Sequence, residues 1–226
     1  MLLVRDVVDT LRNGELATVF TDFPLEENYD KFFINLNNAL TYLCNRFSII
    51  EKQLTLRRYA HIAHYKLEKR FARTSGSTEP YKYILDTEEE PFKEDIIQIE
   101  KAYDEWGTPV PLNDAINPHS WFTSNNLIQI PNTHFTGEVA FFVYRAYHPR
   151  VHELNDQLLV PEILLDAICS YIAYKVHSTR TDQESVALAN NFYQKFEAQC
   201  LAFEQDNSLS TSHTNTNIKP RLGGWV

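Results

Sequence analysis

Two pairs of histidines are the residues whose spacing comes nearest to a metal site. His61 and His64 lie three positions apart, but no carboxylate stands at a spacing that would supply a third ligand. His148 and His152 lie four positions apart, but Pro149 falls between them and breaks the helical turn that would bring them together. We therefore interpret all four as packed or surface residues and expect no metal.

The three cysteines are the other residues with reactive side chains. Cys44, Cys169 and Cys200 are odd in number and widely spaced, and no CxxC pair is present. Each lies on an apolar helical stripe, so we interpret them as small core residues. A reducing compartment is the simplest setting for such cysteines.

No motif for nucleotide binding or hydrolytic catalysis is present, and the whole chain has only 6 glycines for phosphate-binding loops. The acidic run 87–90 is typical of a solvated edge and not of a catalytic carboxylate pair. The sequence indicates no catalytic combination of a nucleophile, a general base and a group that orients the base. We expect a protein that is not an enzyme and that needs no cofactor.

Hydrophobic periodicity predicts four helices. Apolar residues recur every three or four positions in four segments, 2–13, 28–47, 161–178 and about 182–205. In the last of them the expected buried stripe is Val186, Ala189, Tyr193, Phe196, Cys200 and Phe203.

The middle of the chain has the alternating pattern of strands. Strand-like segments are 51–59, 81–85, 96–103, 126–130 and 138–147, whereas 60–72 is ambiguous. Segment 139–147 is apolar at successive positions, which favours a strand covered on both sides. Residues 104–107, followed by Pro109 and Pro111, predict turns.

This order of elements predicts an α+β fold. Two N-terminal and two C-terminal helices would form one helical body from residues 1–49 and 151–206, because neither pair alone can bury its stripe. Residues 50–150 would form a β-rich insertion. Residues 207–226 would form an extended C-terminal arm.

The arm differs in composition from the rest of the chain. Residues 207–217 carry no charge when their histidine is neutral, and they contain a single aliphatic side chain. Such a segment cannot support a core. The tip combines apolar and cationic residues that we interpret as partner-binding: Ile218, Lys219, Pro220, Arg221, Leu222, Trp225 and Val226. A frayed terminus is the alternative, but an exposed Trp is costly in solubility unless it fills a pocket.

Charge is segregated along the chain. Residues 46–73 carry eight cationic and two acidic side chains, and residues 88–105 carry two cationic and eight acidic ones. The two segments could meet between subunits of a ring, pair within one chain, or present a basic lining to DNA. The net charge of −9 argues against a protein that coats nucleic acid.

The N-terminus reaches charged residues too early for a signal peptide, and no uninterrupted apolar run approaches 18 residues. We therefore expect a soluble protein that is made in a cytoplasm and has no membrane partner.

The order of the predicted elements and several short sequence segments resemble those of the head-to-tail connector adaptors of tailed bacteriophages. They are similar to tail tubular protein A of short-tailed phages and to ring proteins of crAss-like phages. The resemblance covers nearly the whole chain, without a diagnostic catalytic motif, and is carried by segments 32–47, 96–105, 111–114, 126–131, 143–148 and 160–167, with the arm.

The resemblance implies a non-enzymatic virion protein of the neck. Such adaptors form a twelve-fold homo-oligomeric ring beneath the portal, extend the channel for double-stranded DNA and receive further tail or ring proteins. It also implies that residues 207–226 embrace the portal or a sister subunit. Two alternatives remain, a soluble cytoplasmic adaptor module that binds peptides or proteins and an enzyme of unrecognised type.

Overall fold

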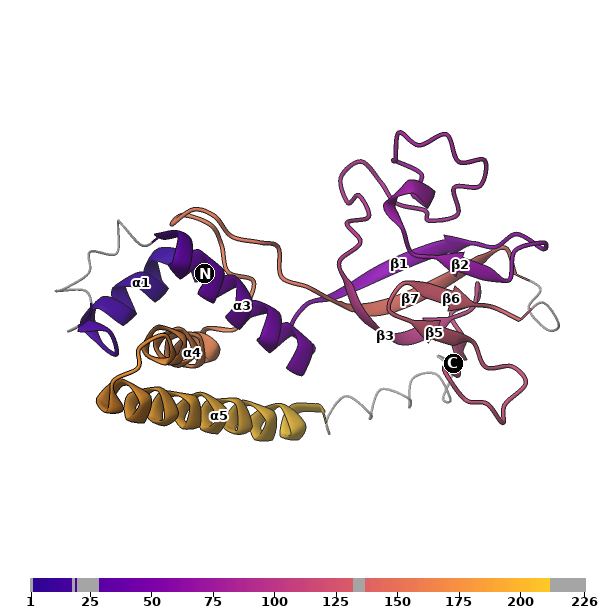
Figure 1. Cartoon of the computed structure of the whole chain (residues 1–226). Helices are drawn as coiled ribbons and strands as arrows, with labels where there is room; N and C mark the ends of the chain where they lie inside the picture. Colours follow the sequence, from indigo (N-terminus) through magenta and orange to yellow (C-terminus); the bar gives the residue numbers. More distant parts are fainter. Residues whose placement is uncertain (1, 18, 20–28, 132–136, 212–226) are drawn as a thin grey trace, which may run out of the picture. The chain divides into compact units, whose positions relative to one another are not determined.

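The computed structural model describes residues 2–17, 19, 29–131 and 137–211, with side chains up to Asp206 (Figure 1). Its helices and two antiparallel sheets confirm the α+β class. The chain divides into two compact units. The helical unit comprises residues 1–43 and 149–226, and the β-rich unit comprises residues 44–148.

The first helix of the helical unit, α1 (Val4–Asn13), begins against a later loop. The N–H groups of Val4 and Arg5 donate to the carbonyls of Asp156 and Leu154, at 3.1 and 3.0 Å. Free N–H groups at a helix start need such acceptors. The buried side of α1 is Val4, Val7, Val8 and Leu11, four of the five residues of the predicted stripe. The fifth, Leu3, precedes the helix and is half-buried.

The second described helix, α3 (Tyr29–Arg46), buries Phe32, Leu36, Leu40 and Leu43, as the periodicity predicts. Asn37 connects this helix to the segment that follows the β-rich unit in the sequence. Its side chain accepts the N–H of Val151 at 3.0 Å and donates to the Val151 carbonyl at 2.9 Å.

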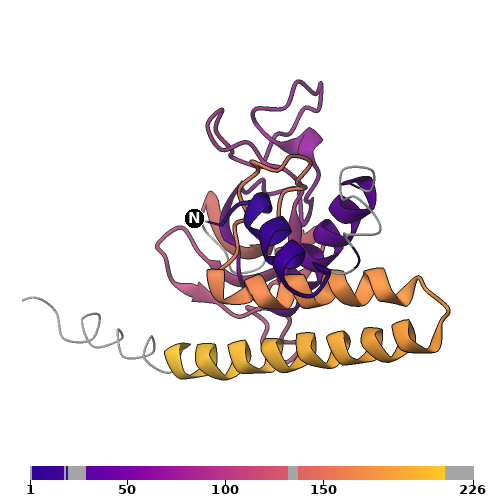
Figure 2. The ribbon, with the colours of Figure 1, turned by 90° about the vertical axis from the view of Figure 1, so that its left-hand side faces the viewer.

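The C-terminal part of the helical unit is a helical hairpin (Figure 2). A short 3₁₀ turn, η3 (Glu162–Leu164), leads into α4 (Leu165–Ser178), and α5 (Gln183–Thr211) returns alongside it. The carboxylate of Asp182 accepts the N–H of Ser185 at 2.8 Å and so caps the start of α5.

The expected stripe of α5 is partly wrong. Ala189, Phe196, Cys200 and Phe203 are buried, but Val186 is 48% exposed and Tyr193 is 42% exposed. Position 185 is buried instead, so the buried face is rotated toward Ser185 relative to the prediction.

The β-rich unit contains two antiparallel sheets. The larger has the order β1-β7-β3-β4 and the smaller has the order β2-β6-β5. The bounds are β1 (Glu51–Arg57), β2 (His64–Lys66), β3 (Ile96–Tyr103), β4 (Pro109–Val110), β5 (Phe122–Ser124), β6 (Leu127–Gln129) and β7 (Val139–Ala146). A short 3₁₀ turn, η2 (Lys69–Phe71), follows β2.

The central strand β7 alternates between fully buried and half-buried residues, so only one face of it is fully covered. The cover expected on both sides is therefore complete on one face and partial on the other. The unit's core contains Leu54, Leu56, Trp121, Phe142 and Tyr144, all at most 4% exposed.

Two strand predictions also differ from the structure. Segment 81–85 is not a regular strand, because Ile84 forms only single-residue bridges, to Leu56 and to Ala72. Strand β5 was not expected, since its three residues are too few for an alternating pattern. Pro109, expected in a turn, begins β4, and Pro fits an edge strand because it has no N–H to donate.

Candidate partner-binding surfaces

The residues that the sequence predicts to bind partners lie outside the described part of the chain. They are Ile218, Lys219, Pro220, Arg221, Leu222, Trp225 and Val226. Helix α5 continues to Thr211, so the expected extended arm begins as helix over 207–211. Each residue added to an existing helix gains a hydrogen bond, so residues that would not start a helix can prolong one.

An aromatic cluster, here called the tyrosine face, joins three helices of the helical unit. Tyr42 comes from α3, Tyr171 and Tyr174 from α4, and Tyr193 and Phe196 from α5. Ring centroids lie 5.3 Å apart for Tyr42 and Phe196, 5.2 Å for Tyr171 and Phe196, and 5.2 Å for Tyr174 and Tyr193. The rings form one continuous patch.

The tyrosine face has a buried floor and an exposed rim. Tyr171 is 8% exposed and Phe196 is fully buried, whereas Tyr42 and Tyr193 are 37% and 42% exposed. Tyr174 is half-buried between them. Tyrosines of this kind are enriched where proteins bind one another, because they combine a large apolar surface with a polar tip.

Charged groups border the tyrosine face. The ammonium of Lys175 lies 5.4 Å from the ring centroid of Tyr171 and 5.0 Å from that of Tyr174. On the other side, the hydroxyl of Tyr42 donates to Glu197 at 3.2 Å. The cation therefore lies over the buried Tyr171 and the half-buried Tyr174, and the hydrogen bond orients the exposed ring of Tyr42.

A second aromatic cluster lies on the β-rich unit. Tyr81 packs edge-on against Tyr59 and His61, with centroid distances of 5.2 and 4.7 Å, and the Arg57 guanidinium lies 5.9 Å from the Tyr59 ring. The hydroxyl of the buried Tyr65 accepts the Tyr59 N–H at 2.9 Å, which anchors the loop. His61 and Tyr81 are exposed.

The turn between β3 and β4 presents an exposed tryptophan. The Asp104 carboxylate accepts the N–H groups of Trp106 and Thr108 at 3.0 and 2.7 Å, and Gly107 takes the positive φ of 76° that the turn requires. Trp106 is 67% exposed. The turn is therefore held by its own hydrogen bonds while its largest side chain faces solvent.

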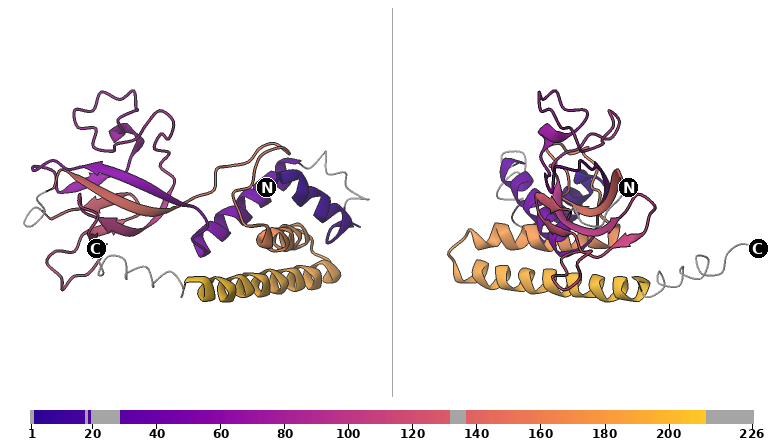
Figure 3. Two further views of the ribbon diagram at one scale, coloured as in Figure 1. Left: turned by 180° about the vertical axis from the view of Figure 1, so that it is seen from behind. Right: turned by 90° about the vertical axis from the view of Figure 1, so that its right-hand side faces the viewer.

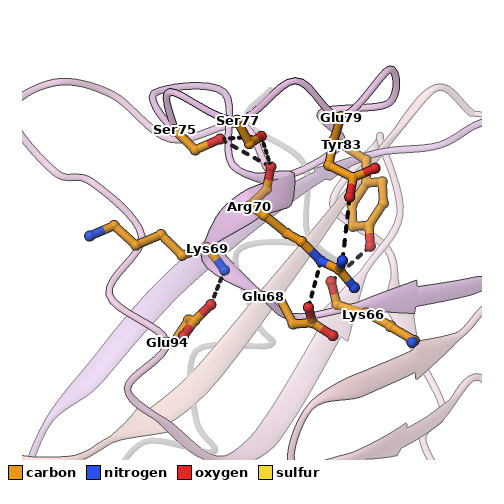
Figure 4. A network of polar contacts seen from close by, with 9 residues as sticks. All are labelled: Lys66, Glu68, Lys69, Arg70, Ser75, Ser77, Glu79, Tyr83 and Glu94. Atoms are coloured by element: carbon orange, nitrogen blue, oxygen red, sulfur yellow. Dashed lines mark hydrogen bonds and ion pairs between the residues drawn. The ribbon is translucent and has the colours of Figure 1, made fainter.

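The long connection between β2 and β3 is held by polar contacts (Figure 4). The Arg70 guanidinium lies 2.7 Å from the Glu68 carboxylate and 3.4 Å from that of Glu79. Ser75 and Ser77 both donate to the Arg70 carbonyl. One arginine thus joins three stretches of the loop through its side chain and its backbone.

Of two further contacts in Figure 4, one joins the two ends of this connection and the other ties it to β2. The Lys69 N–H donates to the Glu94 carboxylate, and the Tyr83 hydroxyl donates to the Lys66 carbonyl at 2.8 Å. Burial raises the pKa of Tyr83 well above its usual value. Tyr83 therefore stays a hydroxyl donor at physiological pH.

Asp86 holds the second half of the same connection. Its carboxylate accepts the Thr74 N–H at 2.9 Å and the Phe92 N–H at 3.0 Å, and also a short hydrogen bond from the Thr74 hydroxyl. Burial opposes ionisation of Asp86, but these hydrogen bonds outweigh it and lower its pKa.

The two oppositely charged segments meet within the chain at the ion pair of Lys52 and Asp95 and at the hydrogen bond from the Lys69 N–H to the Glu94 carboxylate. Glu100 of the acidic segment pairs instead with Arg145, at 2.6 Å. The charge pattern left three alternatives open, and one of them, pairing of the two segments within one chain, is therefore seen at Lys52. The acidic run 88–90 is exposed, as a solvated edge should be.

Cys44 lies beside the backbone of His148. No group of three or more His, Cys, Asp or Glu residues suited to a metal ion occurs among the described residues. All three cysteines are buried, and burial raises the pKa of Cys44 and Cys169. Raised thiol pKa values disfavour the reactive thiolate, in agreement with a packing role. No helix in the described ranges is long and apolar enough to span a membrane.

No protein-family model and no curated protein matches this chain.

The tyrosine face and the Trp106 turn were not predicted as surfaces. One available signal was the spacing of Tyr171 and Tyr174, three apart on one helix, which places both rings on one side. The contribution of Tyr42 could not be read locally, because it is more than a hundred positions away in the chain.

Proposed function

We propose that this chain is a structural head-to-tail connector of a tailed-phage virion. In this role it docks beneath the portal, forms a ring with sister subunits and extends the DNA channel toward the tail. The proposal rests on the resemblance of the sequence and on one structural observation. The helical unit is assembled from both ends of the chain, the residues between them form the β-rich unit, and the last helix leads into the C-terminal tip.

This layout suits a connector for a physical reason. Residues 212–226 follow directly on the 29-residue helix α5, so the tip starts from the end of a long helix when it reaches for a partner. Exposed aromatic side chains in both units offer further contact sites, and aromatic residues supply much of the binding energy at protein interfaces.

The test is to mix the purified chain with its portal protein and measure the mass of the complex by light scattering. We expect a ring on the portal with the full chain. We expect none with a chain truncated after Thr211, whose circular dichroism and melting temperature should match those of the full chain. A chain that binds no portal at any stoichiometry would rule out the connector role.

Trp225→Ala sharpens the same test. If Trp225 fills a pocket on the portal or on a sister subunit, the substitution should weaken binding by about 2 kcal/mol or more. Ile116→Ala is the control and should leave binding unchanged, because Ile116 is an exposed apolar residue outside the aromatic surfaces described above. Equal binding by the wild type and Trp225→Ala would remove the tip from the interface.

The second candidate is a soluble adaptor module that binds peptides or proteins. The cluster of Tyr59, His61 and Tyr81 beside Arg57 favours it, since exposed rings next to a cation suit an extended acidic peptide. Under this alternative, truncation after Thr211 would leave partner binding intact, and Tyr81→Ser would weaken it.

A further inference from the structure

The exposed side of α5 carries an apolar strip with acidic residues in it. Val186, Tyr193 and Leu201, spaced seven and eight residues apart, share one side of the helix and are 48%, 42% and 50% exposed. Glu197 and Glu204, four and eleven residues after Tyr193, fall on the same side. The strip runs past the rim of the tyrosine face, which Tyr193 belongs to.

The C-terminal tip has the complementary composition. Residues 218–226 contain two cations, Lys219 and Arg221, and no acidic side chain. Their apolar side chains are Ile218, Pro220, Leu222, Trp225 and Val226. Apolar groups can cover the exposed rings while the two cations meet the carboxylates of the strip.

The tip is also long enough to reach this surface on its own chain. Tyr193 lies 18 residues before Thr211, which is about 27 Å along a helix. Trp225 lies 14 residues after Thr211, and an extended chain of that length spans about 46–50 Å. Linkage through α5 also gives the tip a high effective concentration at this face.

We propose that residues 218–226 dock on the tyrosine face of their own chain when no partner is present. Trp225 then lies among Tyr42, Tyr174 and Tyr193, and Lys219 and Arg221 face Glu197 and Glu204. A partner that binds residues 218–226 must then displace them from the tyrosine face. This inference concerns the isolated chain and goes beyond the connector role.

The experiment uses the full chain labelled with 5-fluorotryptophan and observed by ¹⁹F NMR. The chain has 3 tryptophans, so three resonances are expected, and Trp225→Phe identifies that of Trp225. In the wild type this resonance should be displaced from its position in a free peptide of residues 212–226. Tyr193→Ser should lower the ratio of docked to free tip about tenfold or more, since it removes an aromatic anchor.

Tyr81→Ser is the matched control, because Tyr81 is 41% exposed but belongs to the β-rich unit. It should leave the Trp225 resonance in place. The resonances of Trp106 and Trp121 report on the fold of that unit in every variant. If Tyr193→Ser were to disturb the helices, the double substitution of Glu197 and Glu204 by Lys tests the same contact through charge, and it should also free the tip.

Two results would overturn the proposal. One is a Trp225 resonance that coincides with that of the free peptide in the wild type. The other is a displacement that disappears on dilution, which would assign the face to the tip of a second copy. Neither result bears on the connector role, which portal mixing tests separately.

Discussion

The two units of this protein are stabilised in different ways. In the helical unit, stripes of apolar residues on four helices pack together, with polar side chains used mainly as caps and clamps such as Asp182 and Asn37. The β-rich unit has an apolar core too, but its long connection 67–95 has few regular elements and is held by Arg70 and Asp86. Figure 3 shows this contrast between regular helices and long loops.

The comparison teaches where each unit is sensitive. Apolar burial depends little on pH and salt, so the helical unit should respond chiefly to lost side-chain volume. Hydrogen-bonded carboxylates depend on their charge, so the connection 67–95 should respond to acid and to single polar substitutions.

The largest expected effect is a cavity in the helical unit. Phe196 is fully buried under the tyrosine face, and Phe196→Ala should lower the free energy of unfolding by about 3–5 kcal/mol. Val186→Ala, at an exposed position of the same helix, should change it by less than about 0.5 kcal/mol. Chemical denaturation measures both. Similar effects of the two substitutions would show that α5 does not bury the face described here.

A smaller, local effect is expected in the connection 67–95. Asp86→Ala leaves the N–H groups of Thr74 and Phe92 without their acceptor and should cost about 1–3 kcal/mol. Hydrogen exchange should become faster at Thr74 and Phe92 but not in α4. Glu89→Ala, an exposed acid of the same connection, is the control and should change neither.

The same carboxylate predicts a pH effect. The pKa of folded Asp86 is lower than that of the unfolded chain, about 3.9. Its contribution is therefore present above that pH and is lost as the pH falls through the folded pKa. Asp86→Ala should reduce the loss of unfolding free energy between neutral and acidic pH, measured by chemical denaturation. An unchanged loss would show that other groups cause the acid sensitivity.

His177 should give the helical unit a pH dependence below neutral pH. His177 is buried at the end of α4 and stacks on Phe192, with centroids 5.5 Å apart. Burial, together with the charge of Arg180, lowers its pKa, so the folded chain resists a proton that the unfolded chain takes up. Stability should decline as the pH falls below about 6.5, the unfolded value, until the folded pKa is passed.

His177→Phe should remove this decline, because the ring remains stacked and no proton can be bound. The measurement is the free energy of unfolding between pH 7 and pH 5, with His61→Gln, an exposed histidine of the other unit, as the control. A decline of equal size in wild type and His177→Phe would exclude His177 as its source. We expect this effect to be the smallest of those considered.

The amino-acid sequence by itself determined the α+β class and most elements. Helix α3 and strand β3 follow their predicted ranges closely, because a long apolar stripe or a sustained alternation depends only on neighbouring residues. The packing role of the three cysteines could also be read locally. For the tip residues 218–226, composition supports a docking role, and the described structure does not reach them.

Only the tertiary structure decided the rest. The order β1-β7-β3-β4 and the short strand β5 depend on which distant segments meet. The two bridges of Ile84 require Leu56 and Ala72 to lie beside it. The tyrosine face requires Tyr42 of α3 to pack against Phe196 of α5. The exposure of Tyr193 was set by how α5 rotates against α4, since a helical pattern alone does not say which edge of a broad apolar stripe will face solvent.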